Sequence, residues 1–441
     1  MEGTPAMQMM HAASAASARI AAPRSGTLIA ANGNVRPVRE PVRVAGLGVV
    51  SVFGTTLDRF RDALLDGRSG IVAVKNFDTS GCRSTIAAEI DQFDPSLFVP
   101  AMKMRRMDRT AVYTVAATRL ALQDADVTIP PEGDDDRGVM LGTWTAGGGS
   151  TQVFLDALFK QGPSGAPALL FDSTVANSAA SIAALEHRLR GPNMTVSHKE
   201  ASGLAAIVTA VDLLRERRAA ALVAGGADAI FETFFKAHER FAVMSPQRSA
   251  SPRTAPFDAC RDGFVLGEGA VGLWMERAES AADRGHGDIL GVATASANVP
   301  LNAWPDRADP LVRTMRLAIE DAGLTPEAVD VVYASANATR QLDAVEAEAL
   351  TTLFAGTRTV VTSIKGAIGE SGVSGSAACA AALLCGRAGR VPPIANLAEP
   401  DPAAASLRLA RTSLTAPGPI ALVNSVASGG ALFSVVLRAS V

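Results

Sequence analysis

An internal repeat constrains the fold of this chain more than any other feature of its sequence. The stretch RLALQDADV at 119–127 returns as RLAIEDAGL at 316–324, about 197 residues later. Each copy is followed by a short polar connection and a β-branched run, RGVMLGTW at 137–144 and VDVVYASA at 329–336. A small-residue turn, an Ala-rich helical stretch and another strand-like run then follow in the same order. The sequence therefore predicts two similar α/β halves with buried strands and crossover helices.

The duplication also predicts where a ligand site lies. Equivalent loops of two α/β halves meet at the carboxyl ends of their strands, where such sheets usually bind ligands. TVSHKEASG at 195–203 is one of these loops, because a predicted strand ends there and an amphipathic helix begins. The apolar residues of that helix are Leu204, Ile207, Val208, Val211 and Leu214. The loop presents Glu200 where a strand-to-helix turn often displays a nucleophile.

Charge and cysteine content exclude several classes of function. Lysine plus arginine (41) nearly balance aspartate plus glutamate (44), which leaves no overall field to attract nucleic acid or an anionic membrane. Cys82, Cys260, Cys379 and Cys385 lack the spacing of a disulfide framework or a zinc site. We therefore expect reduced thiols, no metal and a cytoplasmic protein.

Neither the apolar runs, the N-terminal segment nor the glycine-rich stretches point to a membrane protein, a secreted protein or a nucleotide-binding protein. No apolar run approaches the roughly 20 residues that cross a bilayer. Residues 1–41 lack the basic start and apolar core of a signal peptide, so we expect a flexible N-terminal extension, with a targeting segment as the alternative. GLGVVS at 46–51 lacks the third glycine of a dinucleotide fingerprint, and GTWTAGGGS at 142–150 lacks the Gly-Lys-Ser/Thr of a P-loop. No cofactor is expected.

A series of longer motifs gives a specific resemblance. The motifs VAGLGVVSVFG, NFDTSG, RRMDR, GPNMTV, VAGGADA, PFDACRDGFVLGEGA, TSIKGAIGE and VPPIANLAEPDP occur in this order. Over about residues 42–441 the chain thus resembles the β-ketoacyl-acyl carrier protein (ACP) synthases of the thiolase fold. This resemblance implies an α/β protein with a duplicated five-layer αβαβα architecture, in agreement with the repeat. It also implies an N-terminal half at 42–287 and a C-terminal half at 288–441.

Active members of that family use one cysteine and two histidines, and the resemblance locates all three positions here. The cysteine position, followed by Ala-Ser-Gly, falls on Glu200 in KEASG. The first histidine position, eight residues before Asp343, falls on Ser335, and the second falls on Glu370 after the Lys-x-x-x-Gly motif. Only the lysine of that motif, Lys365, remains. No catalytic residue of the family is therefore intact.

These replacements predict a site that does not condense acyl chains. Attack by Glu200 on a thioester would give a mixed anhydride that hydrolyses readily, whereas condensation needs an acyl-enzyme that persists. An ionised Glu370 about 4 Å from a developing enolate would cost on the order of 4 kcal/mol at an effective dielectric near 20. That cost slows the reaction roughly a thousandfold.

We expect structural roles for the altered residues. A carboxylate at a helix start accepts backbone N–H bonds, so Glu200 is expected to do so. Glu200 is also expected to pair with Lys365, because that lysine has lost its usual catalytic neighbours. Ser428 stands where the resemblance places a gating phenylalanine.

Within the family, this pattern is similar to the chain-length factor, or ketosynthase β subunit, which commonly carries glutamine at the cysteine position. The resemblance implies a heterodimer with an active Cys-His-His ketosynthase and an ACP as further partner. In this reading the subunit is not catalytic and shapes the channel for iterative malonyl-ACP condensation in polyketide or polyene biosynthesis. An isolated chain is expected to expose a large apolar surface and to self-associate.

The resemblance places the channel near the helix that follows RRMDR. The candidate channel-lining residues are Thr110, Ala111, Val112, Thr114 and Val115. The alternative for each is an ordinary core position. Two other functions remain open: an autonomous acyl-ACP decarboxylase or hydrolase that uses Glu200 as a base, and a homodimeric acyl-carrier binding protein. The sequence reveals neither the starter unit nor the length and class of the product.

Overall fold

The computed structural model describes residues 27–29, 35–37, 39–247, 254–280 and 285–440. Thr27–Ile29 (β1) and Val35–Pro37 (β2) pair as a short antiparallel ladder. Arg39–Val441 form a separate compact unit. Most of the predicted N-terminal extension lies outside the described residues.

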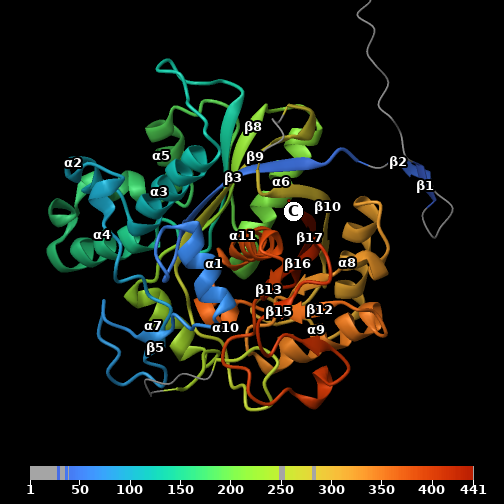
Figure 1. The fold of residues 1–441 in the computed structure, drawn as a ribbon. Helices are drawn as coiled ribbons and strands as arrows, with labels where there is room; N and C mark the ends of the chain where they lie inside the picture. The colour runs from blue at the N-terminus through green and yellow to red at the C-terminus, as the bar shows by residue number, and fades with distance from the viewer. Residues whose placement is uncertain (1–26, 30–34, 38, 248–253, 281–284, 441) are drawn as a thin grey trace, which may run out of the picture. The chain divides into compact units, whose positions relative to one another are not determined.

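One mixed sheet runs through the compact unit (Figure 1). In the described part of the chain it has 11 strands. Their spatial order is β14 (Arg408–Leu409), β12 (Val360–Thr362), β11 (Val331–Tyr333), β16 (Ile420–Val426), β17 (Ala431–Ala439), β10 (Gly287–Ser296), β3 (Val42–Val50), β9 (Gly269–Arg277), β8 (Ala221–Asp228), β6 (Arg137–Gly142) and β7 (Asn193–Val196).

The two halves of this sheet repeat one pairing pattern. In the first half, β6 is parallel to β7 and β8, and β9 is antiparallel to β8 and β3. In the second half, β11 is parallel to β12 and β16, and β17 is antiparallel to β16 and β10. The halves join where Val42–Val44 of β3 pair with Gly287–Ile289 of β10.

Helices cover both faces of each half-sheet and complete five layers, αβαβα. On the outside of the first half lie α3 (Arg109–Asp124) and α5 (Ser178–His187), and on the outside of the second half lie α8 (Asp309–Asp321) and α9 (Arg340–Phe354). The central layer consists of α6 (Ser202–Arg215) and α11 (Ser374–Arg387), which pack against each other. The architecture predicted from the sequence is confirmed.

The sequence repeat occupies equivalent places in the two halves. RLALQDADV ends α3 and RLAIEDAGL ends α8. In the first copy Asp124 Oδ2 accepts a hydrogen bond from the backbone N–H of Leu47, at 2.8 Å. In the second copy Asp321 Oδ2 accepts one from the backbone N–H of Val292, at 3.0 Å. Each carboxylate thus ties the end of an outer helix to a strand of its own half.

Two glycines explain how closely those helices approach the sheet. A Cβ atom on Gly46 would lie 2.4 Å from the carbonyl oxygen of Ala121 in α3. A Cβ atom on Gly291 would lie 2.2 Å from the carbonyl oxygen of Ala318 in α8. Both positions require glycine, because no side chain fits at such distances.

The central helices bring the KEASG turn against the second half. The predicted apolar residues of α6 are all buried in the central core. At its amino end, the N–H of Gly203 donates to the carbonyl of Gly372 at 2.7 Å, and a Cβ on Gly203 would collide with that oxygen. The starts of α6 and α11 therefore meet directly. In the described part of the chain, no helix is both long and apolar enough to span a membrane.

Candidate functional site

The four residues singled out by the sequence lie in the segments that follow the carboxyl ends of parallel strands. Glu200 follows β7, Ser335 follows β11, and Lys365 and Glu370 follow β12. Their exposed fractions are 2, 0, 4 and 1 %, respectively. The structure thus brings charged side chains into the interior, where a charge needs a close partner.

Lys365 is the centre of one buried cluster. Its Nζ lies 2.7 Å from Glu370 Oε2 and donates to Ser335 through the carbonyl oxygen at 2.7 Å and Oγ at 3.2 Å. Lys365 begins the one-turn helix α10 (Lys365–Ile368), and Gly369, with φ +73°, turns the chain so that Glu370 faces the lysine. Three acceptors satisfy the three N–H donors of the ammonium group.

Asn337 completes this cluster, although the sequence analysis did not single it out. Its Nδ2 donates to Glu370 Oε2 at 2.7 Å. The loop that carries Asn337 is fixed by Asp343, whose Oδ1 accepts from the N–H groups of Asn337 and Ala338 at 2.9 and 3.2 Å. Burial raises the pKa of Asp343 to about 7.

Glu200 belongs to a second cluster, with Ser428 of the loop between β16 and β17. The backbone N–H of Ser428 donates to Oε2 at 3.0 Å, and its hydroxyl donates to Oε1 at 2.9 Å. The predicted pair between Glu200 and Lys365 is therefore wrong, because the turn at Gly369 presents Glu370 to the lysine instead. Glu200 accepts a backbone N–H bond as expected, but the donor is Ser428 and not a residue at the start of α6.

The environment of Glu200 disfavours its charged form. Burial raises its pKa to about 7, and the negative charge of Glu370 adds to this effect. The hydrogen bonds from Ser428 oppose the shift but do not cancel it. Protonated and ionised forms of Glu200 therefore coexist near neutral pH.

Asp228, at the end of β8, joins the two halves beside these clusters. Its Oδ1 accepts from the N–H groups of Trp144 and Thr145, both at 2.8 Å, and its Oδ2 accepts from the N–H of Gly372 at 2.6 Å. The motif VAGGADA contained this residue, but nothing in the sequence identified its partners. Asp228 holds the loop after β6 against the start of α11.

The candidate channel residues on α3 lie inside the single chain. All five are at most 8 % exposed. Ala111 packs in a core with residues of the first half-sheet, and Val112 and Val115 pack with Val99 and Ala183. Thr110 alone of the five lines a pocket of about 280 Å³, which α4 (Gly148–Gln161) and the residues after β8 also border.

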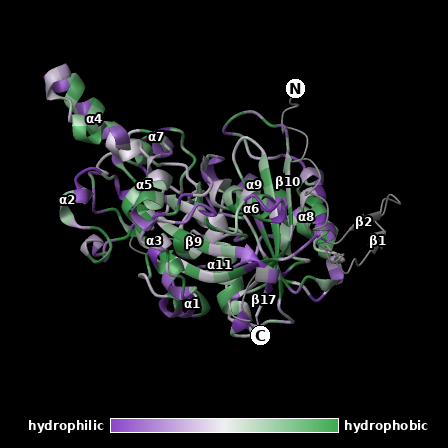
Figure 2. Ribbon diagram, turned by 90° about the horizontal axis from the view of Figure 1, so that it is seen from above, coloured by the Kyte–Doolittle hydropathy of each residue, from purple (hydrophilic) through white to green (hydrophobic). Residues whose placement is uncertain are grey.

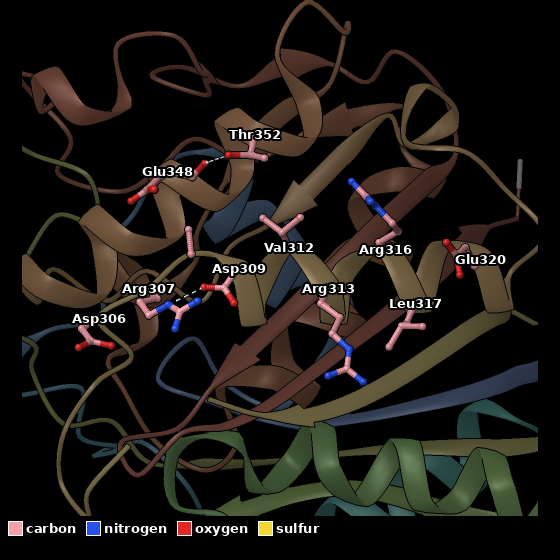
Figure 3. Close-up of a pocket in the computed structure, with 11 residues that line it drawn as sticks. Asp306, Arg307, Asp309, Val312, Arg313, Arg316, Leu317, Glu320, Glu348 and Thr352 are labelled. Atoms are coloured by element: carbon pink, nitrogen blue, oxygen red, sulfur yellow. Dashed lines mark hydrogen bonds and ion pairs between the residues drawn. The ribbon is translucent and has the colours of Figure 1, made fainter. Parts of the chain in front are cut away.

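A larger pocket of about 590 Å³ lies elsewhere, between α8 and α9 (Figure 3). Its charged groups are of mixed sign, and Figure 3 shows the side chains of Arg313 and Arg316 pointing to opposite sides of α8. Arg307 is paired with Asp309 at 2.9 Å. These groups do not converge on one point, so the pocket lacks the arrangement of a built binding site.

The chemistry available at the candidate site follows from the two clusters. Carboxylates, an ammonium group, an amide and hydroxyls occupy the positions that the sequence analysis identified. A carboxylate forms no persistent acyl-enzyme, and the ammonium group is fully engaged by Glu370 and Ser335. The arrangement is suited to stabilising the interior.

A duplicated αβαβα fold with its centre at the start of a middle-layer helix defines the thiolase-fold class. The models of the beta-ketoacyl synthase N-terminal and C-terminal domains match residues 39–281 and 286–398. The chain belongs to the β-ketoacyl synthase family.

The relatives of the chain include two kinds of protein. The 3-oxoacyl-[acyl-carrier-protein] synthase 2 of Synechocystis sp. is 31% identical over 403 residues, which cover 89% of this chain and 96% of the relative. The tetracenomycin polyketide synthase ketoacyl synthase beta subunit of Streptomyces glaucescens is 33% identical over 371 residues, covering 82% and 89%. The solved structure of the ishigamide ketosynthase/chain length factor matches with a TM-score of 0.85 and 28% identity, covering 91% of this chain and 100% of that one.

Proposed function

We propose that this protein is a non-catalytic chain-length-factor subunit. It pairs with an active ketosynthase and shapes the channel for iterative malonyl-ACP condensation in polyketide or polyene biosynthesis. The observation that carries the proposal is the buried cluster in which Lys365 bonds to Glu370 and Ser335. At the two positions assigned to histidines, a carboxylate and a hydroxyl thus bind the remaining lysine.

Sequence similarity alone does not choose between a catalytic and a non-catalytic member. A 3-oxoacyl-ACP synthase and a ketoacyl synthase beta subunit match this chain at 31% and 33% identity. The side chains of the proposed centre support a non-catalytic member, because Glu200 bonds to Ser428 and supplies no thiol. The likeness to a ketosynthase/chain length factor structure supports the same choice.

A group of exposed apolar side chains on the first half supports a partner subunit. We call it the α4 surface, and Figure 2 shows α4 at the outer edge of the molecule, beyond α5 and α7 (Glu232–Arg240). Its exposed apolar residues are Val153, Leu155, Phe159, Leu169, Phe171, Val175, Leu185 and Met194. Phe159 is 81 % exposed. Such a patch on a folded protein indicates an interaction site.

The sheet ends beside this surface. Met194 lies in β7, which pairs with β6 on one side and forms the end of the 11-stranded sheet. An edge strand presents unpaired N–H and C=O groups that another chain can bind. The edge and the apolar patch together support an association through the first half of the chain.

Copurification tests the proposal. This chain, carrying an affinity tag, is coexpressed with a ketosynthase that has the Cys-His-His set and is encoded beside it. We expect a stable one-to-one heterodimer that survives gel filtration. A stable homodimer that leaves the ketosynthase unbound would contradict the proposal and favour a homodimeric acyl-carrier binding protein.

The raised pKa of Glu200 favours one second candidate, an autonomous acyl-ACP decarboxylase or hydrolase. A group with a pKa of about 7 is matched to acid–base chemistry near neutral pH. This candidate requires that the purified single chain turns over malonyl-ACP and that Glu200→Ala abolishes the turnover. The pseudoenzyme proposal requires no turnover in either protein.

A further inference from the structure

A row of polar contacts leads from Glu200 to the surface. Glu200 is 2 % exposed, and the half-buried Ser428 hydroxyl covers it. Lys199, also half-buried, places its Nζ 3.3 Å from that hydroxyl and donates as well to Oδ1 of the exposed Asn302. Ser428 and Lys199 are half-buried and Asn302 is exposed, so the row connects the buried Glu200 with the surface.

The residues of this row come from three separate segments. Lys199 precedes α6, Asn302 lies in the loop after β10, and Ser428 lies in the loop after β16. The last two loops are joined by backbone hydrogen bonds of 2.8 Å, from the N–H of Gly429 to Ala303 and from that of Ala297 to Gly430. The side chain of Lys199 therefore contacts two loops that are hydrogen-bonded to each other.

The backbone of Lys199 is held in an unusual conformation. Its φ is +50°, in the left-handed region, which is unfavourable for a residue with a Cβ. A neighbouring bond supports this conformation, since Ser202 Oγ donates to the carbonyl of Lys199 at 2.6 Å. The direction of the lysine side chain toward Asn302 is thus set by the fold.

Trp144, Phe234 and His238 form an aromatic cluster in the first half. The rings of Trp144 and His238 lie 5.0 Å apart, and those of Phe234 and His238 lie 4.4 Å apart. Burial lowers the pKa of His238, and the positive charge of Lys199 lowers it further.

We propose that Lys199, Asn302 and Ser428 form a strap that closes the mouth above Glu200 against the pantetheine arm of an acyl carrier. The inference deepens the proposed function and rests on it for its biological meaning. If this mouth is closed, a carrier protein can deliver its thioester only at the partner ketosynthase, and acyl groups reach this subunit only through the shared channel.

Site-directed alkylation tests the strap. Glu200→Cys places a thiol below it without removing the contact between Lys199 and Asn302. The probe is a pantetheine derivative that carries a bromoacetyl group, and the thiolate forms a C–S bond as bromide leaves. Peptide mapping by mass spectrometry separates the label at position 200 from label at Cys82 and Cys260, which are not buried.

We expect the Glu200→Cys/Lys199→Ala protein to be labelled at position 200 at least tenfold faster than Glu200→Cys alone. The Glu200→Cys/Asn302→Ala protein is expected to behave similarly. The matched control is Glu200→Cys/Lys75→Ala, because Lys75 is exposed and pairs with Asp91 away from this row. It is expected to react at the rate of Glu200→Cys alone.

Equal labelling rates with and without the strap, whether fast or slow, would overturn the inference. Thermal unfolding and gel filtration of each variant verify that faster labelling does not come from loss of the fold. The experiment uses the full chain without a partner, so its outcome is independent of copurification. A failed copurification would refute the subunit role, whereas equal labelling rates would refute the strap.

Discussion

Glu370 and Lys365 form a buried ion pair, with 2.7 Å between Oε2 and Nζ and side chains that are 0 and 5 % exposed. Burying two charges is costly, and the pair is stable because further hydrogen bonds from Asn337 and to Ser335 complete it. The position at which the sequence predicted the family's second histidine is therefore part of a buried, hydrogen-bonded cluster.

Breaking this pair is expected to destabilise the protein strongly. Lys365→Met leaves the carboxylate of Glu370 buried without its cation, which typically costs about 3–5 kcal/mol of unfolding free energy. Lys365→Met/Glu370→Gln removes both charges and is expected to recover part of that loss. Denaturant titration, followed by circular dichroism, measures the free energy of unfolding of the wild-type protein and of these two variants.

The control for this prediction is Lys75→Met, which breaks an exposed pair of similar length. Lys75 Nζ lies 2.8 Å from Asp91 Oδ2. Its replacement is expected to leave the denaturation midpoint unchanged, because solvent screens exposed pairs. Equal small effects of Lys365→Met and Lys75→Met would show that the buried pair is not structural.

The pKa of Glu200 predicts a pH dependence of stability. The group has a pKa of about 7 in the folded protein against an ordinary value of 4.5, so between these values the folded state keeps a proton that the unfolded chain loses. The contribution of Glu200 to the free energy of unfolding therefore falls by on the order of 3 kcal/mol as pH rises from about 4.5 to 7. Above pH 7 this contribution stays level.

Glu200→Gln removes the titration of residue 200 and leaves that of Asp343, whose pKa is also raised to about 7. The difference in stability between the wild-type protein and this variant therefore reports on Glu200 alone. We expect the wild-type protein to lose stability relative to Glu200→Gln between pH 5 and pH 8, measured by chemical denaturation. Parallel stability curves for the two proteins across this range would contradict the prediction.

The candidate channel residues predict effects on product length. We expect Ala111→Trp and Val115→Trp, each coexpressed with the active ketosynthase, to shorten the product by at least one malonyl-derived unit. Thr110→Trp, at the pocket of about 280 Å³, is expected to act in the same direction. Mass spectrometry of the acyl products measures the length.

Gln123→Trp is the matched control, because it places the same side chain at an exposed position near the end of α3. It is expected to leave product length unchanged. An overpacked core typically costs 1–3 kcal/mol, so the amount of assembled complex is measured for each variant. Unchanged products from complexes with Ala111→Trp and Val115→Trp would remove the channel assignment for α3.

The α4 surface predicts self-association of the isolated chain. Phe159→Lys/Phe171→Lys introduces charge at two exposed apolar positions, and we expect it to weaken self-association of the single chain at least tenfold. It is also expected to impair copurification with the ketosynthase. Light scattering after gel filtration measures the association.

Val72→Lys tests whether any added charge has this effect, since Val72 is 39 % exposed but lies in β4 (Val72–Ala73), outside the α4 surface. It is expected to associate as the wild-type chain does. A monomeric wild-type chain at high concentration would show that the α4 surface is not an interface.

The sequence predicted the duplicated architecture well because the signals for it are local and repeated. Two copies of a helix end, each with an Asp that bonds to a strand, predicted equivalent positions for α3 and α8. The start of α6 and the loop of Glu200 were also located, since apolar residues at helical spacing follow a small-residue turn.

The partners within the centre could not be predicted from the sequence. Lys365 and Glu370 are five residues apart, but their contact depends on the left-handed turn at Gly369. Ser428 lies 228 residues after Glu200, and no local pattern indicates which of the buried carboxylates it binds. Asn337 was missed for the same reason, because its partner is fixed by the packing of two loops.

Condensation by the purified single chain tests the central claim most directly. The chain is incubated with an acyl-ACP primer and malonyl-ACP, alone and with its ketosynthase partner, and both protein and products are analysed by intact mass spectrometry. We predict no covalent acyl adduct and no extended product from the single chain, and defined extended products from the pair. An acyl adduct on the single chain, followed by elongation of that group, would contradict the account.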